Sequence, residues 1–151
     1  MNDVYERYIA NLLRMNLDKY TIHSQHNKYK LLTSERTDKD IFSLIPDIVI
    51  EVDNKERLII DTKWKRINES KNRHGVKRED LYQMYAYLTR YKDVKSSILL
   101  YPSAHEDNKD DFLESWYLES DKEKKIRIYT IDLYNEANTI DTLKYIISKN
   151  L

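Results

Sequence analysis

The chain has 151 residues, a formal net charge of zero and no cysteine. This length predicts one domain with its own core, and two prolines and one glycine leave no candidate flexible linker. The lack of cysteine excludes a disulfide framework and a cysteine-based metal site, as expected of a cytoplasmic protein. Without a long apolar run or a charged leader, we expect neither a membrane span nor a signal peptide.

The first segment is predicted to be an amphipathic helix, with Asp3 as its N-cap and Glu6 completing a capping box. Residues 20–32 alternate loosely, which favours a strand or a hairpin, and the polar residues 33–43 are predicted to form a connection. The apolar residues of the helix follow helical spacing: Tyr5, Tyr8, Ile9, Leu12 and Leu13.

The central segment predicts an antiparallel β-hairpin. Two β-branched runs, residues 48–52 and 58–60, flank the polar residues 53–56. Such a pattern indicates two strands that turn near Asn54. The start of the first strand would then lie beside the end of the second.

Three charged residues would meet at the open end of this hairpin. Asp61 and Lys63 are two residues apart on a strand and share a face. Asp47 joins them only if it pairs with residue 61 or 63, which requires an odd-length turn around Asn54 or a bulge beside Asp47. A ladder pairing Asp47 with Thr62 would separate the acids. The grouping predicts a Mg²⁺ site, because Mg²⁺ prefers oxygen ligands and keeps sites for water and phosphate.

The zero net charge hides two segments of opposite sign. Residues 62–78 carry a net charge of +6, and residues 105–123 carry −6. The basic segment directly follows Asp61, where a phosphate backbone would need to be neutralised. A solvated loop is the alternative interpretation of such a charge run.

A second helix is predicted over residues 78–90. Gln83 and Tyr87 lie four residues apart and line one side of it. An amide and a phenol can bind a phosphate or orient a catalytic side chain. The alternative is an ordinary amphipathic helix, and the nearby Asp47 and Asp61 favour the functional interpretation.

The remaining elements complete an α/β order. Residues 94–101 predict a buried strand that ends at Pro102, residues 112–118 and 126–133 predict two more strands, and residues 138–149 predict a final helix. The order α-β-β-β-α-β-β-β-α predicts a mixed sheet flanked by helices.

Several of these motifs resemble those of a known family. Pro46-Asp47 and Asp61-Thr62-Lys63 resemble the PD-(D/E)xK nuclease signature. Together with residues 80–87 they make the chain, from Val4 to Pro102, similar to the nuclease domain of McrC, the cleavage subunit of the modified-cytosine restriction system. The resemblance implies a restriction-endonuclease-like fold. It also implies one nuclease domain over residues 1–151 that lacks the N-terminal partner-docking part of McrC.

The resemblance further implies a metal-dependent DNA endonuclease that uses Mg²⁺, with Mn²⁺ as the alternative ion. Its partners would be DNA, a GTP-dependent McrB-like AAA+ motor that recognises the modified base, and a second nuclease domain on the DNA. The implied catalytic residues are Asp47, Asp61, Lys63, Gln83 and Tyr87. The implied metal ligands are Glu6, Asp47, Asp61 and the backbone carbonyl of Thr62.

Two other functions remain open. The Gln83-x-x-x-Tyr87 pair also resembles a motif that borders the active site of RecB-like nucleases, so the chain could be a repair exonuclease module. It could instead be a catalytically silent nuclease fold that only binds a partner. Dependence on DNA ends distinguishes the first alternative, and a metal titration distinguishes the second.

Overall fold

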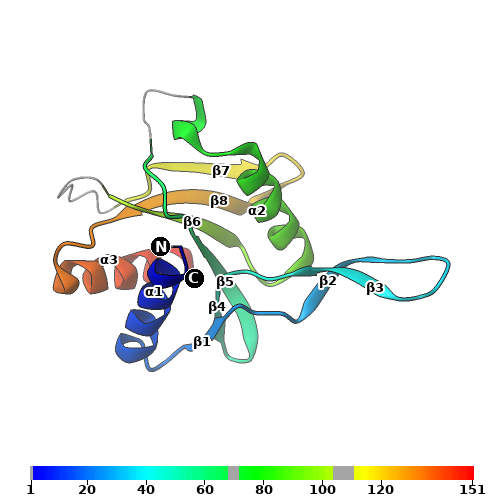
Figure 1. The fold of residues 1–151 in the computed structure, drawn as a ribbon, viewed down its shortest axis with the longest axis horizontal. Coiled ribbons are helices and arrows are strands. Elements are labelled where there is room, and N and C mark those ends of the chain that lie inside the picture. Colours follow the sequence, from blue (N-terminus) through cyan, green and yellow to red (C-terminus); the bar gives the residue numbers. More distant parts are fainter. Residues whose placement is uncertain (1, 68–71, 104–110) are drawn as a thin grey trace.

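The main sheet has six strands in the order β1-β4-β5-β6-β8-β7 (Figure 1). The structure is a computed structural model that describes residues 2–67, 72–103 and 111–151. The neighbours β5, β6 and β8 run parallel, whereas β1, β4 and β7 pair antiparallel with their neighbours. The predicted α/β class is confirmed. The strands are β1 (Thr21–Ser24), β4 (Ile48–Val52), β5 (Lys55–Thr62), β6 (Ser96–Pro102), β7 (Glu114–Leu118) and β8 (Asp121–Ile131).

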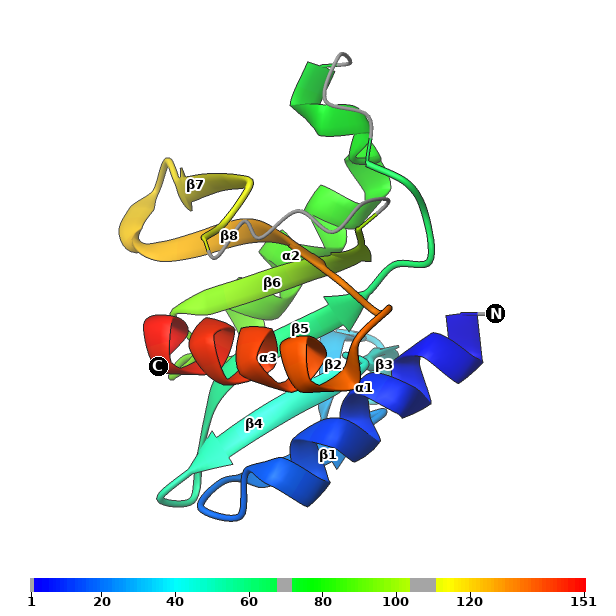
Figure 2. The same cartoon turned by 90° about the vertical axis from the view of Figure 1, so that its left-hand side faces the viewer.

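Helices cover both faces of this sheet. The helices α1 (Asn2–Asn16) and α3 (Glu136–Asn150) pack on one face, and α2 (Arg78–Arg90) packs on the other (Figure 2). The central strands are therefore apolar on both faces. In β4, Ile48 and Ile50 belong to the α1/α3 core, while Val49 belongs to the α2 core. Burying each such side chain stabilises the fold by about 1.5–3 kcal/mol.

The β4–β5 hairpin has the register that a shared acid site requires. Asp53 and Asn54 form its turn with positive φ angles of 52° and 64°, as a two-residue hairpin loop of the primed type demands. The register shifts next to the turn, where Arg57 is an extra residue without a partner in β4. Beyond this bulge Ile48 pairs with Ile60, so residue 47 comes opposite residue 61. The register is as predicted, but the bulge lies beside the turn and not beside Asp47.

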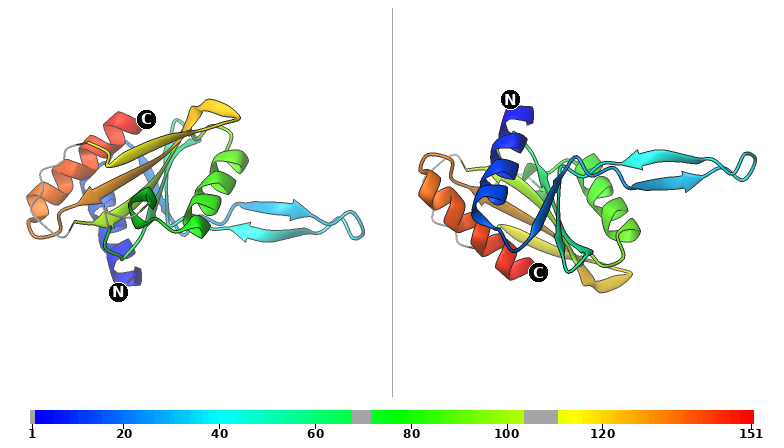
Figure 3. Two further views of the ribbon diagram at one scale, coloured as in Figure 1. Left: turned by 90° about the horizontal axis from the view of Figure 1, so that it is seen from above. Right: turned by 90° about the horizontal axis from the view of Figure 1, so that it is seen from below.

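Two short strands form a separate arm. The strands β2 (Tyr29–Thr33) and β3 (Asp40–Leu44) pair with each other and project away from the rest of the fold (Figures 1 and 3). The prediction that residues 33–43 are only a connection is therefore wrong. The strand pattern was hidden because much of the arm is exposed on both faces, so apolar and polar residues do not alternate. The segment 20–32 contains two strands, which belong to different sheets.

The first helix includes two residues, Asn2 and Asp3, that the prediction placed before it. Helix α1 includes Asn2, so Asp3 lies inside its first turn and is not the N-cap. The capping box is wrong too, because the Glu6 carboxylate accepts a hydrogen bond from Gln25 instead. Among the described residues, no helix has the length and apolar character needed to cross a membrane.

The later elements follow the prediction with shifted bounds. The strand predicted over residues 126–133 is longer at its start and ends at Ile131. Helix α3 begins at Glu136, because the Asn135 side chain accepts a hydrogen bond from the backbone N–H of Asn138 and caps it. Residues 68–71 of the basic segment and 104–110 of the acidic segment lie outside the described residues.

Candidate metal and catalytic site

The two predicted acids meet on the α2 side of the hairpin. The backbone N–H of Asp47 donates to Asp61 Oδ1 over 3.3 Å. The backbone N–H and the hydroxyl of Thr62 both donate to Asp47 Oδ2 over 2.9 Å. Asp61 is only 2% exposed. The bulge at Arg57 makes this possible, because it turns residues 59 and 61 toward α2.

Both acids resist ionisation. Burial raises the pKa of Asp47, although the hydrogen bonds from Thr62 act in the opposite direction. Burial and then the negative charge of Asp47 raise the pKa of Asp61 to about 6. These are the two causes expected when carboxylates share a buried site. Without a further cation, Asp61 takes up a proton as the pH falls through about 6.

Lys63 supplies one compensating charge. Its Nζ lies 2.7 Å from Asp61 Oδ2 and 3.4 Å from Asp80 Oδ1. Burial by itself would lower the pKa of Lys63, but Asp61 and Asp80 raise it above its ordinary value. The ammonium group therefore stays charged, and one lysine is shared between two carboxylates.

Helix α2 brings the predicted glutamine and tyrosine to the same place. Gln83 Oε1 accepts from Lys63 Nζ over 3.3 Å. Gln83 Nε2 donates to the hydroxyl oxygen of Tyr87 over 2.9 Å. Burial and then the charge of Asp61 raise the pKa of Tyr87, so its phenol stays neutral. The pair thus holds the lysine from the helix side.

Glu6 has only an indirect connection to the two acids. It lies on α1, which packs against the other face of the sheet. Its carboxylate accepts from Gln25 Nε2, and the same amide donates to Asp47 Oδ1 over 3.4 Å. The backbone N–H of Gln25 also donates to the Asp47 carbonyl over 2.8 Å. Glu6 therefore connects to the acid pair through Gln25.

Sequence reasoning missed three residues of the site. Asp80 was not among the predicted site residues, yet it shares one side of α2 with Gln83 and Tyr87, at spacings of three and seven. That spacing was the available signal. Gln25 and Tyr101 gave no signal in the sequence, because contacts between separate elements of the fold place them in the site. Asp80 Oδ2 and the Tyr101 hydroxyl are buried and lack a hydrogen-bond partner among the described residues.

The residues fit a hard divalent cation. Among the described residues, no three His, Cys, Asp or Glu side chains are grouped as metal ligands. Mg²⁺ nevertheless commonly binds through one or two carboxylates, with water and substrate phosphate completing its shell. Asp47 and Asp61 provide two carboxylates whose pKa values are raised by burial and, for Asp61, by the negative charge of Asp47.

A mixed sheet flanked by helices, with Pro46-Asp47 and Asp61-Thr62-Lys63 meeting at the open end of a central hairpin, defines a restriction-endonuclease-like fold. The family model described as "McrBC 5-methylcytosine restriction system component" matches residues 1–102. The chain belongs to this family.

A solved structure supports the same assignment of the fold. It is described as a refined half-complex from the tetradecameric assembly of Thermococcus gammatolerans McrB AAA+ hexamers with bound McrC. One of its chains is similar to this chain with a TM-score of 0.68 and 19% identity. The match covers 97% of this chain and 33% of that chain, so this chain spans about a third of the length of its relative. No curated protein matches. The predicted resemblance to McrC is confirmed.

Proposed function

We propose that the chain is a Mg²⁺-dependent endonuclease domain that hydrolyses DNA phosphodiester bonds. It acts as the cleavage component of a modification-dependent restriction system with a GTP-dependent AAA+ partner. The observation that carries this proposal is the meeting of two acids and a lysine: the Asp47 backbone N–H donates to Asp61 Oδ1 over 3.3 Å, and Lys63 Nζ lies 2.7 Å from Asp61 Oδ2. Burial and the charge of Asp47 raise the pKa of Asp61, and acids with raised pKa values cluster at functional sites.

The acids and the lysine have different roles in this proposal. Asp47 and Asp61 hold Mg²⁺, or Mn²⁺ in its place, with the Thr62 carbonyl and Glu6 as further ligands. When bound, the ion lowers the pKa of a water molecule and neutralises charge on the scissile phosphate. Lys63 places its ammonium next to the attacking water or the developing phosphorane charge.

The helix side supports the lysine. Gln83 holds Lys63 Nζ through its amide oxygen, and Tyr87 fixes the orientation of that amide. Asp80 keeps the lysine charged. These residues position Lys63.

The partner and the DNA follow from the family. The similar solved structure contains McrB AAA+ hexamers with bound McrC, and an equivalent motor would recognise the modified base for this chain. A pair of nuclease domains on DNA would cut both strands. Alone, the chain should cut DNA poorly and without sequence preference.

A cleavage assay tests the proposal. The chain is combined with its AAA+ partner, GTP, Mg²⁺ and methylated plasmid DNA. We expect Asp61→Ala and Asp47→Ala each to lower the cleavage rate at least about a hundredfold, because the ion's stabilisation of the transition state is worth several kcal/mol. The exposed Asp141 on α3 is the matched control, and Asp141→Asn should cleave like the parent. Full cleavage by Asp61→Ala would place the active site elsewhere.

Two further measurements separate the alternatives. Cleavage that needs linear DNA and fails on closed circles would indicate a RecB-like exonuclease. A calorimetric titration in which neither Mg²⁺ nor Mn²⁺ binds the parent more tightly than Asp61→Ala would indicate a catalytically silent fold.

A further inference from the structure

Three parallel strands end at the same edge of the sheet as the acid pair. Residues 64–66 follow β5, Ser103 follows β6, and Tyr134 comes shortly after β8. In open α/β sheets, ligands bind outside the carboxyl ends of such strands. Asp61 and Lys63 occupy this edge on the β5 side.

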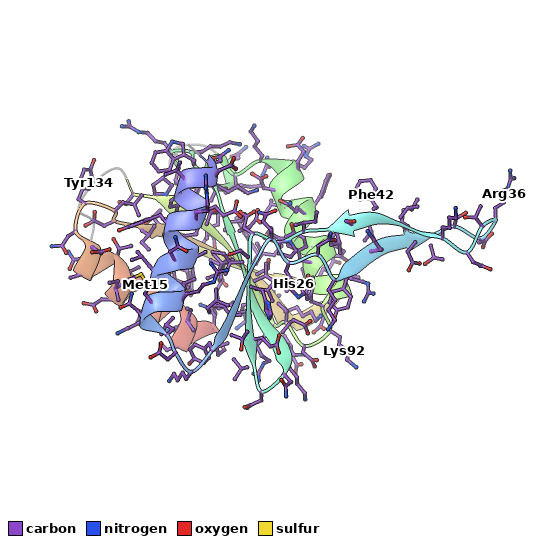
Figure 4. All side chains as sticks on the ribbon, turned by 60° about the horizontal axis from the view of Figure 1, so that its bottom comes forward. Met15, His26, Arg36, Phe42, Lys92 and Tyr134 are labelled. Atoms are coloured by element: carbon purple, nitrogen blue, oxygen red, sulfur yellow. The ribbon has the colours of Figure 1, made fainter. Side chains whose placement is uncertain are left out.

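A cleft of about 340 Å³ lies there. Its volume falls within the range of small-ligand sites. Two aromatic rings from distant parts of the chain line it: Trp64 is 39% exposed and Tyr134 is 76% exposed. Figure 4 labels Tyr134 at the end of the molecule opposite the arm. The other lining residues are Lys65, Arg66, Pro102 and Ser103.

The Trp64 ring packs against Tyr5 of α1. Its centroid lies 5.3 Å from that of the buried Tyr5, with the planes tilted by 56°. The Trp64 backbone N–H also donates to Asn2 Oδ1 over 3.3 Å. A positioned ring with an exposed part can accept a stacking partner at little cost in entropy.

The cleft also carries unbalanced positive charge. In the described parts of the chain, no carboxylate pairs with Lys65 or Arg66. The neighbouring amine of Lys77 lowers the pKa of Lys65, although Asp80 acts in the opposite direction. Two neighbouring amines attract an anion, and a phosphate would supply one.

We propose that this cleft binds an unpaired nucleotide of single-stranded DNA, with its base between Trp64 and Tyr134 and its phosphate on Lys65 and Arg66. The proposal rests on the DNA-cleaving function above and adds to it a subsite for the strand beside the scissile bond. Aromatic stacking combined with backbone-binding cations is how proteins hold single strands without reading sequence. A duplex would not fill the site, because its bases are already stacked.

Tryptophan fluorescence tests the subsite directly. The chain has two tryptophans, so Trp116→Phe leaves Trp64 as the only one. An oligothymidylate of about ten nucleotides is titrated into this variant in EDTA, where no cleavage occurs, and binding is followed in parallel by anisotropy. We expect saturable quenching of Trp64 by the single strand and much less by a blunt duplex of equal length.

Variants then assign the contacts. Tyr134→Ala should weaken oligothymidylate binding about fivefold or more, the usual loss of one stacked base. The matched control is Tyr117→Ala, which removes a tyrosine that is 58% exposed on β7, and it should bind like the parent. Trp64→Leu should weaken binding and Trp64→Phe should largely restore it.

Three results would overturn the subsite: no binding of oligothymidylate, binding without quenching, or equal affinity of parent and Tyr134→Ala. The Asp61→Ala variant separates this outcome from failure of the proposed function. Quenching that persists in Asp61→Ala while cleavage is lost supports both proposals. Quenching that persists while Asp61→Ala still cleaves DNA refutes the catalytic site alone.

Discussion

The two ends of β5 carry buried acids in opposite electrostatic conditions. Near the start of the strand, Glu56 Oε1 accepts from Lys28 Nζ over 3.0 Å and from the Tyr29 hydroxyl over 3.3 Å. Burial acts to raise the pKa of Glu56, but its hydrogen bonds and Lys28 bring it below the ordinary value. Near the end of the strand, burial and Asp47 raise the pKa of Asp61 to about 6.

The surroundings of Glu56 form a closed network. His26 Nδ1 lies 2.7 Å from the Tyr91 hydroxyl oxygen, and His26 Nε2 lies 3.9 Å from Glu56 Oε1. Burial and then the neighbouring His23 lower the pKa of His26, so it is neutral at neutral pH. Every acid in this cluster is matched by donors, and the cluster needs no ligand.

The acids around Asp61, in contrast, are not fully matched by donors and cations. Asp61 and Asp80 share the Lys63 ammonium group, whose charge also acts on Asp47. Both acids are buried, so burial alone does not explain why their pKa values shift in opposite directions. The difference comes from the balance of donors and cations against carboxylates around each acid.

The pH dependence of stability tests this balance most strongly. The folded-state pKa of Asp61, about 6, exceeds its unfolded value. Its contribution to stability is therefore fully present below about pH 4 and lost as pH rises through 6. In EDTA, Asp61→Asn should match the parent at pH 4 and exceed its free energy of unfolding at pH 7 by up to about 3 kcal/mol.

Chemical denaturation of both proteins from pH 4 to 7 provides the measurement. Because Mg²⁺ binds the carboxylate form, adding it at pH 7 should stabilise the parent and leave Asp61→Asn nearly unchanged. A variant that loses stability at pH 7 in EDTA would make Asp61 a structural acid, like Glu56.

Removing the matched acid should have the opposite effect. Glu56→Ala leaves the Tyr29 hydroxyl and Lys28 without their acceptor and should lower the free energy of unfolding by about 2 kcal/mol at pH 7. Cleavage with the AAA+ partner should stay near the parent rate at a temperature where both are folded. Glu56→Gln retains an acceptor and should recover part of the loss. A stable but inactive Glu56→Ala would contradict the distinction between the two clusters.

Sequence patterns were enough to bring together the five candidate residues that lie on one hairpin and one helix. Because side chains alternate along a strand, Asp61 and Lys63 share a face, and the hairpin register brings Asp47 to them. The spacing of four residues places Gln83 and Tyr87 on one side of the helix. The register was predicted to need an odd-length turn around Asn54 or a bulge beside Asp47. The bulge lies at Arg57 instead, and no residue type marks that position.

Contacts between separate elements could not be predicted in the same way. Gln25 reaches Asp47 because its positive φ of 49° turns the chain at the end of β1, and a glutamine gives no signal of that conformation. Strand β3 was missed because exposed residues of the arm such as Leu32 and Ile41 are not arranged as in a half-buried strand. Asp80 had a readable spacing, but charge near a helix start has a simpler explanation.

The smallest expected change in stability comes from removing the charge of Lys63. Lys63→Met removes the charge but keeps much of the side-chain volume, so Asp61 and Asp80 lose their compensation. The cost in EDTA should be only about 1 kcal/mol at pH 6, because Asp61 can take up a proton instead of remaining a buried, unpaired charge. Its pKa then rises further, and the loss of stability with pH should extend above pH 7.

Thermal melts of Lys63→Met at pH 6 and 8, with and without Mg²⁺, check this prediction. The matched control is Lys95→Met, which removes a half-exposed lysine from a 3.6 Å pair with Glu123 and should change stability little. Mg²⁺ should still raise the melting temperature of Lys63→Met, because both carboxylates remain. If Mg²⁺ no longer stabilised Lys63→Met, the lysine would be needed to assemble the ligands, and its assignment to the attacking water would be wrong.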